Sequence, residues 1–136
     1  MTFVLDASIS AAWAFDEVSA AASEARKRMR RESAVAASLW WFEMRNALIQ
    51  GERRGRFTQT RTTRFLRYIS RLAITLDRAP DEGSVLALAR RHRLTVYDAA
   101  YLELAVREAL PLVTLDAALA AAARAEQVAL IGADIH

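Results

Sequence analysis

The chain has 136 residues, a formal net charge of +3 and 54% hydrophobic residues, which predicts one domain over residues 1–136 and excludes a disordered chain. It has no cysteine, which excludes a disulfide framework and thiolate metal sites and fits a cytoplasmic protein. No apolar run approaches the roughly 18 residues of a membrane span, and no basic segment precedes the first apolar residues, so we expect neither a membrane helix nor a signal peptide.

Short apolar runs that end at polar residues predict the strands. The first lies at 2–5, where Phe3, Val4 and Leu5 precede Asp6, and further candidates lie at 34–37, 73–76, 112–115 and 128–131. Helical patterns fill the intervals, at 9–15, 17–31, 39–54, 58–71, 81–92, 98–109 and 117–125. Residues 94–97 fit either a brief strand or a loop. The alternation predicts an α/β fold, a central, mostly parallel sheet of four to five short strands flanked by helices.

Polar residues mark the expected helix starts. Asp6 or Ser8 caps the first helix, and Asp16 with Glu17 opens the second. The later starts are expected at Ser38, Thr58, Pro80 with Asp81, Asp98 and Asp116.

Four acidic side chains lie at or near these junctions: Asp6, Glu43, Asp98 and Asp116. In a parallel sheet the strand-to-helix junctions share the carboxyl edge, so Asp6 and Asp116 are expected there, with Glu43 leaning over it from its helix. Clustered carboxylates repel one another and normally need cations. Hard oxygen ligands suit Mg²⁺ or Mn²⁺, and such an ion can polarise a phosphodiester and activate a bound water.

Each candidate also has a purely structural interpretation. Asp is a favoured helix cap, so Asp6, Asp98 and Asp116 are each explained as caps, a role compatible with metal binding. Glu43 is harder to explain in this way, because its apolar neighbours predict partial burial and a buried Glu needs a partner. Ser8 and Thr114, two residues from acids, have hydroxyls able to orient a carboxylate. Asn46 shares a helix face with Glu43.

Arginine supplies almost all of the basic charge, since Lys27 is the only lysine among 19 basic residues. The planar guanidinium suits phosphate recognition, which makes nucleic acid a plausible partner. Arg64, Arg67 and Arg71 share one face of a predicted helix and are candidates for contact with an RNA backbone. A solvated helix face explains them equally well.

Four segments of the chain together resemble the signatures of PIN-domain ribonucleases: Val4–Ser8, Glu43 with Asn46, Tyr97–Ala105 and Thr114–Asp116. Each motif is short, but their order and spacing are specific, and the resemblance covers essentially the whole chain. The length is similar to that of the VapC toxins of type II toxin–antitoxin systems.

This resemblance implies a small three-layer α/β sandwich with Mg²⁺ or Mn²⁺ in an acidic pocket. It implies endonucleolytic cleavage of RNA by a metal-activated water. The implied catalytic and metal-binding residues are Asp6, Glu43, Asp98 and Asp116, with Asp6 and Asp98 as core ligands and Ser8, Asn46 and Thr114 in support. It further implies a homodimer that a cognate antitoxin protein neutralises, with no membrane partner.

Other classes of α/β protein stay open at this point. A phosphoryl-transfer receiver domain uses paired acids near its first strand and a lysine near its last strands, whereas Ala7 and Ser8 follow Asp6 here. A phosphatase with a nucleophilic aspartate usually has a second acid two residues later, where Ser8 stands. Only an assay separates a nuclease from a non-catalytic RNA-binding or assembly domain of the same fold.

Overall fold

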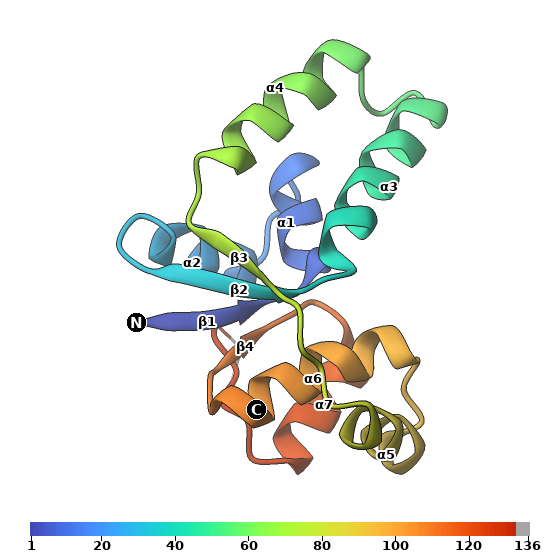
Figure 1. Cartoon of the computed structure of the whole chain (residues 1–136). Coiled ribbons are helices and arrows are strands. Elements are labelled where there is room, and N and C mark those ends of the chain that lie inside the picture. The colour runs from blue at the N-terminus through green and yellow to red at the C-terminus, as the bar shows by residue number, and fades with distance from the viewer. Residues whose placement is uncertain (133–136) are drawn as a thin grey trace.

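A sheet of four parallel strands lies at the centre of the computed structural model, which describes residues 1–132 (Figure 1). The strands are β1 (Thr2–Leu5), β2 (Ser33–Ala37), β3 (Ile74–Asp77) and β4 (Leu112–Val113), in the order β3-β2-β1-β4. Val4 is in register with Val35 of β2 and Leu112 of β4. Because β1 has strands on both sides and helices on both faces, its apolar run Phe3–Leu5 is wholly buried.

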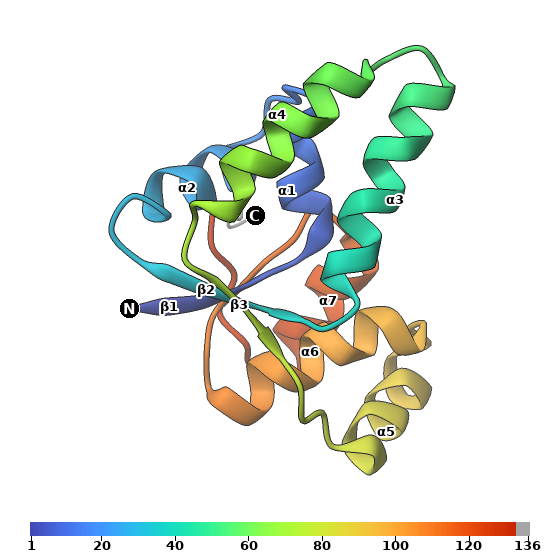
Figure 2. The ribbon, with the colours of Figure 1, turned by 45° about the horizontal axis from the view of Figure 1, so that its top comes forward.

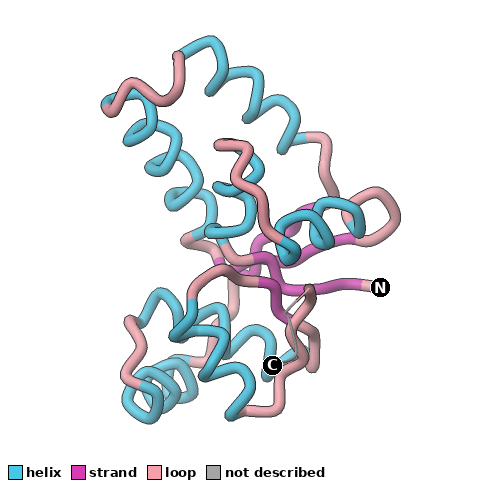
Figure 3. Tube along the Cα trace, turned by 180° about the vertical axis from the view of Figure 1, so that it is seen from behind, coloured by secondary structure: helices cyan, strands magenta, loops and turns pink. Residues whose placement is uncertain are grey.

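Within residues 1–132, seven helices cover the two faces of this sheet (Figures 1 and 2). One face carries α1 (Ala7–Ala14), α2 (Ala20–Arg28), α3 (Trp40–Arg53) and α4 (Gln59–Ser70). The other carries α5 (Glu82–His92), α6 (Val96–Glu108) and α7 (Ala117–Ala125). The view from behind shows the same three layers, with α3 and α4 extending as a pair beyond the sheet (Figure 3). The predicted α/β sandwich with a parallel sheet is therefore confirmed.

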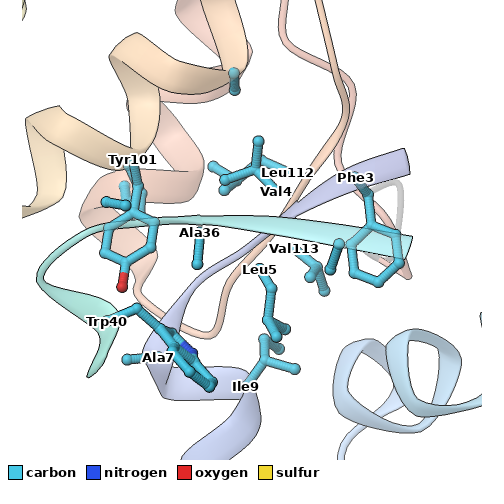
Figure 4. Packing of buried hydrophobic residues seen from close by; sticks show 14 of the residues in the cluster. Phe3, Val4, Leu5, Ala7, Ile9, Ala36, Trp40, Tyr101, Leu112 and Val113 are labelled. Atoms are coloured by element: carbon cyan, nitrogen blue, oxygen red, sulfur yellow. The ribbon is translucent and has the colours of Figure 1, made fainter. Parts of the chain in front are cut away.

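The core joins both helical layers through the sheet. Figure 4 shows β1 and β4 side chains between Trp40 and Ile9 on one side and Tyr101 on the other. A polar link accompanies this packing, since Trp40 Nε1 donates to Ser10 Oγ at 3.0 Å. No helix within residues 1–132 combines the length and the apolar character needed to cross a membrane.

The predicted strand at 128–131 is wrong. This segment makes only an isolated parallel bridge, Leu112 with Leu130, beside a β4 that is itself two residues long. The ladder stays short because β4 ends early: Thr114 and Leu115 leave the sheet and bond to side chains at the end of β1.

Three expected helix starts are also wrong. Asp16 has a φ of 55°, outside the helical region, so α2 begins only after Ser19, whose side chain accepts from Ala22 N. The N-cap of α3 is Leu39 instead of Ser38, and that of α6 is Thr95 instead of Asp98. Local polarity thus identified the junctions, but the geometry of the incoming chain decides which residue caps. The starts at Thr58, Asp81 and Asp116 are confirmed, each with a side-chain cap bond.

Candidate active site

Asp6 directly follows β1 and occupies the N-cap position of α1, but its side chain makes no cap hydrogen bond. Instead its Oδ2 accepts from Ser8 Oγ and from Thr114 Oγ1, both at 2.6 Å. The residue is only 5% exposed. Burial raises the pKa of Asp6, the charge of Asp116 adds to the rise, and the bonds from Ser8, Thr114 and the Ala7 N–H oppose it. Capping therefore does not explain this carboxylate.

The two hydroxyls that hold Asp6 are themselves held by the chain after β4. Ser8 Oγ accepts from Leu115 N at 2.9 Å, and Thr114 Oγ1 accepts from Asp116 N at 3.0 Å. Each hydroxyl accepts one bond and donates its proton to the carboxylate. This arrangement is the one expected of hydroxyls that orient a carboxylate, and it ties the ends of β1 and β4 together.

Glu43 lies in the first turn of α3 and is half-buried, as its apolar neighbours predicted. Its partner is Tyr101, whose hydroxyl donates to Glu43 Oε1 at 2.7 Å. Burial raises the pKa of Glu43, and the charges of Asp6 and Asp98 add to it, while the Tyr101 bond lowers it. Burial, followed by the Glu43 charge, raises the pKa of Tyr101 far above its usual range, so the phenol remains the donor.

Asp98 and Asp116 begin two further helices near Asp6. Asp98 is the third residue of α6, and its N–H donates to the capping Thr95 Oγ1 at 3.1 Å. Burial, with the charges of Asp116 and Asp6, raises the pKa of Asp98 to about 6. Asp116 does cap: its Oδ1 accepts from Leu119 N at 2.9 Å. These mutual effects show that the four acids share one electrostatic neighbourhood at the carboxyl edge.

This neighbourhood lacks a basic partner. In the part of the chain that the structure describes, no ion pair includes Asp6, Glu43, Asp98 or Asp116. Asp77, which ends β3, shows the contrast, since its Oδ2 pairs with Arg107 Nη2 at 2.7 Å. In a chain so rich in arginine, uncompensated carboxylates indicate a place for another cation.

The acids do not form a ready-made cage for that cation. Among residues 1–132, no group of three or more His, Cys, Asp or Glu side chains is gathered closely enough to hold a metal ion. Mg²⁺, however, retains several waters and is usually held by one or two carboxylates, so it needs no such cage. The hard oxygen donors and the uncompensated charge therefore fit a hydrated divalent ion.

The remaining candidates make no hydrogen bond or ion pair with the four acids in the described residues. Asn46 is exposed, and within the described residues its side chain forms no hydrogen bond with Glu43. Arg64, Arg67 and Arg71 lie on or just after α4, and α4 leads into the start of β3. Arg71 is therefore near the amino edge of the sheet, opposite Asp6.

Tyr101 and an apolar rim were not identified from the sequence. The only available signal for Tyr101 was a phenol in a predicted buried helix, whose hydroxyl needs an acceptor. The rim consists of exposed apolar residues next to the acids in the chain: Trp41, Phe42, Val96, Tyr97 and Leu115. Trp41 and Phe42 precede Glu43 and face solvent, whereas Met44, which follows it, is buried.

Comparison with known proteins places this geometry in context. The model of the PIN domain family matches residues 3–125. The structure is similar to the crystal structure of PAE2754 from Pyrobaculum aerophilum, with a TM-score of 0.72, 27% sequence identity, and coverage of 90% of this chain and 84% of that one. No curated protein matches the sequence.

Proposed function

We propose that this chain, which belongs to the PIN domain family, is a metal-dependent endoribonuclease. Members of that family are generally metal-dependent nucleases. We further propose that it is the toxin of a toxin–antitoxin pair, acts in the cytoplasm, and needs Mg²⁺ or Mn²⁺. The toxin role rests on the resemblance of its motifs and length to VapC toxins. The catalytic role rests on the site.

The observation that carries the catalytic proposal is the state of Asp6. Within residues 1–132 this buried carboxylate has no cationic partner and makes no capping bond. Two hydroxyls hold it, and it lies within electrostatic reach of Asp116, Glu43 and Asp98. A structural carboxylate in this fold looks different, as the pairing of Asp77 with Arg107 illustrates. Keeping an uncompensated buried charge is destabilising, and such sites are commonly functional.

In this proposal Asp6 and Asp98 are the core metal ligands, and Glu43 and Asp116 complete the set. A Mg²⁺ or Mn²⁺ ion held there would polarise the phosphodiester of the RNA and lower the pKa of a bound water. Ser8 and Thr114 orient Asp6 through their hydrogen bonds. Asn46, exposed one turn along α3 from Glu43, is available to a bound substrate.

The edge also favours an anionic substrate. The helices α1, α3 and α7 begin directly after β1, β2 and β4, so their amino termini meet at this edge. The positive ends of their helix dipoles favour phosphate. The Arg64, Arg67 and Arg71 face is proposed as a more distant contact for the RNA backbone, because it lies toward the opposite edge.

Two surfaces support the proposed protein partners. The apolar rim suits a second copy of the chain, since each of its side chains is exposed and would lose contact with water in an interface. Two hollows of about 190 and 210 Å³ share the lining residues Trp13, Asp16 and Arg26. The second hollow is lined mainly by aromatic and arginine side chains, which suit a peptide with apolar and acidic residues. We propose that this peptide comes from the antitoxin.

Cleavage of a labelled RNA by the purified protein tests the enzymatic proposal. We expect cleavage with Mn²⁺ and none in excess chelator, and we expect Asp6→Asn to abolish it while circular dichroism shows an intact fold. Asp77→Asn is the matched control, a strand-end carboxylate outside the site that should leave cleavage in place. Cleavage in chelator, or full activity of Asp6→Asn, would refute the proposal.

The toxin role needs a separate test in cells. Expression of the wild-type chain should arrest growth, and co-expression of a neighbouring small gene should relieve the arrest. Asp6→Asn should be harmless. Growth arrest by Asp6→Asn at equal protein levels would instead indicate a non-catalytic RNA-binding or assembly role.

A further inference from the structure

The hydrogen bond between Tyr101 and Glu43 connects helices from opposite faces of the sheet. Glu43 is on α3 and Tyr101 is on α6, and the two residues are 58 positions apart in the chain. Figures 1 and 2 show these helices above and below the sheet, with their first turns near the same edge. A side chain from one layer thus passes the edge of the sheet to reach an acid of the other.

Tyr101 is a rigid donor. It has no exposed surface and is the largest of the fully buried side chains. Figure 4 shows its ring within the core and its hydroxyl pointing to the side where Trp40 and Ala7 lie. A phenol has an ordinary pKa of about 10, so it carries its proton at neutral pH and can donate it to a carboxylate.

Glu43, by contrast, has a flexible side chain with little else to restrain it. It is half-buried, and within the described residues its carboxylate has no other side-chain hydrogen bond and no ion pair. Its neighbours Trp41 and Phe42 are exposed and leave a path to solvent. Without the phenol, repulsion from Asp6 and Asp98 would favour rotamers that turn Glu43 away from them.

The bond engages one oxygen of the Glu43 carboxylate. Within residues 1–132 the other oxygen has no side-chain hydrogen bond, so it is available to a bound ion or its water. Partners that fix a ligating carboxylate in this manner typically change metal affinity about 10- to 100-fold when they are removed. A purely structural tyrosine would need only an acceptor of any kind, with no effect on metal binding.

We propose that Tyr101 is a positioning residue that holds Glu43 toward Asp6 and Asp98, so that the site binds a divalent cation more tightly. This inference rests on the proposed function, since it requires a metal at these acids. It concerns a residue of the buried core instead of the acidic set itself.

Mn²⁺ titration of the purified full chain, followed by calorimetry, tests the inference. Tyr101→Phe removes the hydroxyl and keeps the ring, so the variant should fold and should raise the Kd for Mn²⁺ about 10-fold or more. Tyr68→Phe is the matched control, because its hydroxyl accepts from Arg26 Nε at 3.2 Å outside the site. It should bind Mn²⁺ as the wild type does.

A double-mutant cycle shows whether Tyr101 acts through Glu43. In a Glu43→Ala background, Tyr101→Phe should leave the Kd for Mn²⁺ unchanged, since the group it positions is gone. An equal loss in both backgrounds, or wild-type affinity in Tyr101→Phe, would overturn the inference. If the inference about Tyr101 fails but wild type binds Mn²⁺ and Asp6→Asn does not, the proposed function is still supported. If wild type binds no Mn²⁺, the proposed function and the inference about Tyr101 are both refuted.

Discussion

Thr114→Val offers a quantitative test of how Asp6 is held. Valine has nearly the shape of threonine, so the change removes one hydroxyl from the half-buried position after β4. Asp6 Oδ2 loses one of its two 2.6 Å bonds and keeps the other, from Ser8. A hydrogen bond to a charged group contributes about 1.5–3 kcal/mol, whereas one to a neutral group contributes about 1 kcal/mol.

In the metal-free protein, the loss of unfolding free energy caused by Thr114→Val should depend on pH. The pKa of Asp6 is raised in the folded state, so folding favours its protonated form. The protonated carboxyl therefore contributes its full stabilisation below about pH 4, and this stabilisation is lost as the pH rises through the folded pKa. Thr114→Val removes a bond that lowers this pKa. The variant also loses the bond from Asp116 N to Thr114 Oγ1, which does not depend on the charge of Asp6. It should therefore be less stable than wild type by about 2 kcal/mol near pH 4 and by about 2.5–4 kcal/mol near pH 8.

Urea unfolding in chelator, followed by circular dichroism at both pH values, measures these differences. Thr62→Val is the matched control, because Thr62 Oγ1 donates to Glu52 Oε2 at the same 2.6 Å distance outside the site. Only Thr114→Val should weaken Mn²⁺ binding. A stability difference that does not grow with pH, or an unchanged affinity for Mn²⁺, would show that the Thr114 hydroxyl does not hold Asp6 in its charged, metal-binding form.

Three further predictions concern the acids, the rim and the arginine face. Asp98 has a pKa of about 6 in the folded chain, so metal-free wild type should lose stability between about pH 4 and pH 6, and Asp98→Asn should lose less across the same range. Urea unfolding in chelator measures this, and equal losses would contradict it. Phe42→Ser should shift a dimer toward monomer in sedimentation over a concentration series, because it removes an exposed side chain of the rim. An unchanged mass would indicate that the rim is ordinary solvent-exposed surface and not an interface. Arg67→Glu should weaken RNA binding and flatten its dependence on salt. If the dependence of RNA binding on salt is unchanged, the face formed by Arg64, Arg67 and Arg71 does not contact RNA and is only solvated surface.

Features that depend on neighbouring residues could be predicted from the sequence. The apolar run before Asp6 is a buried strand, and Thr58, Asp81 and Asp116 cap helices through bonds to N–H groups three residues ahead. These structures are encoded within one turn or one strand. Thr95 and Asp98 are two possible caps in one short segment, and the structure uses Thr95. This choice depends on where the chain leaves α5, which the polarity of the neighbouring residues does not reveal.

Features that join distant segments could not be predicted from spacing. Thr114 bonds to Asp6 across 108 positions and Tyr101 bonds to Glu43 across 58. Asp77 shows the limit most clearly, because it follows a predicted strand just as Asp6 does. Only the folded chain shows that Asp77 lies beside Arg107 and that Asp6 has no such partner among the residues that the structure describes.

Anomalous diffraction from crystals grown with Mn²⁺ tests whether the acids at the carboxyl edge bind a divalent cation. We expect an anomalous peak about 2.0–2.3 Å from an Asp6 carboxylate oxygen, with Asp98 in the same coordination shell directly or through water. Asp6→Asn crystals should show no such peak. Full occupancy of a Mn²⁺ site elsewhere, with no peak at Asp6, would contradict it.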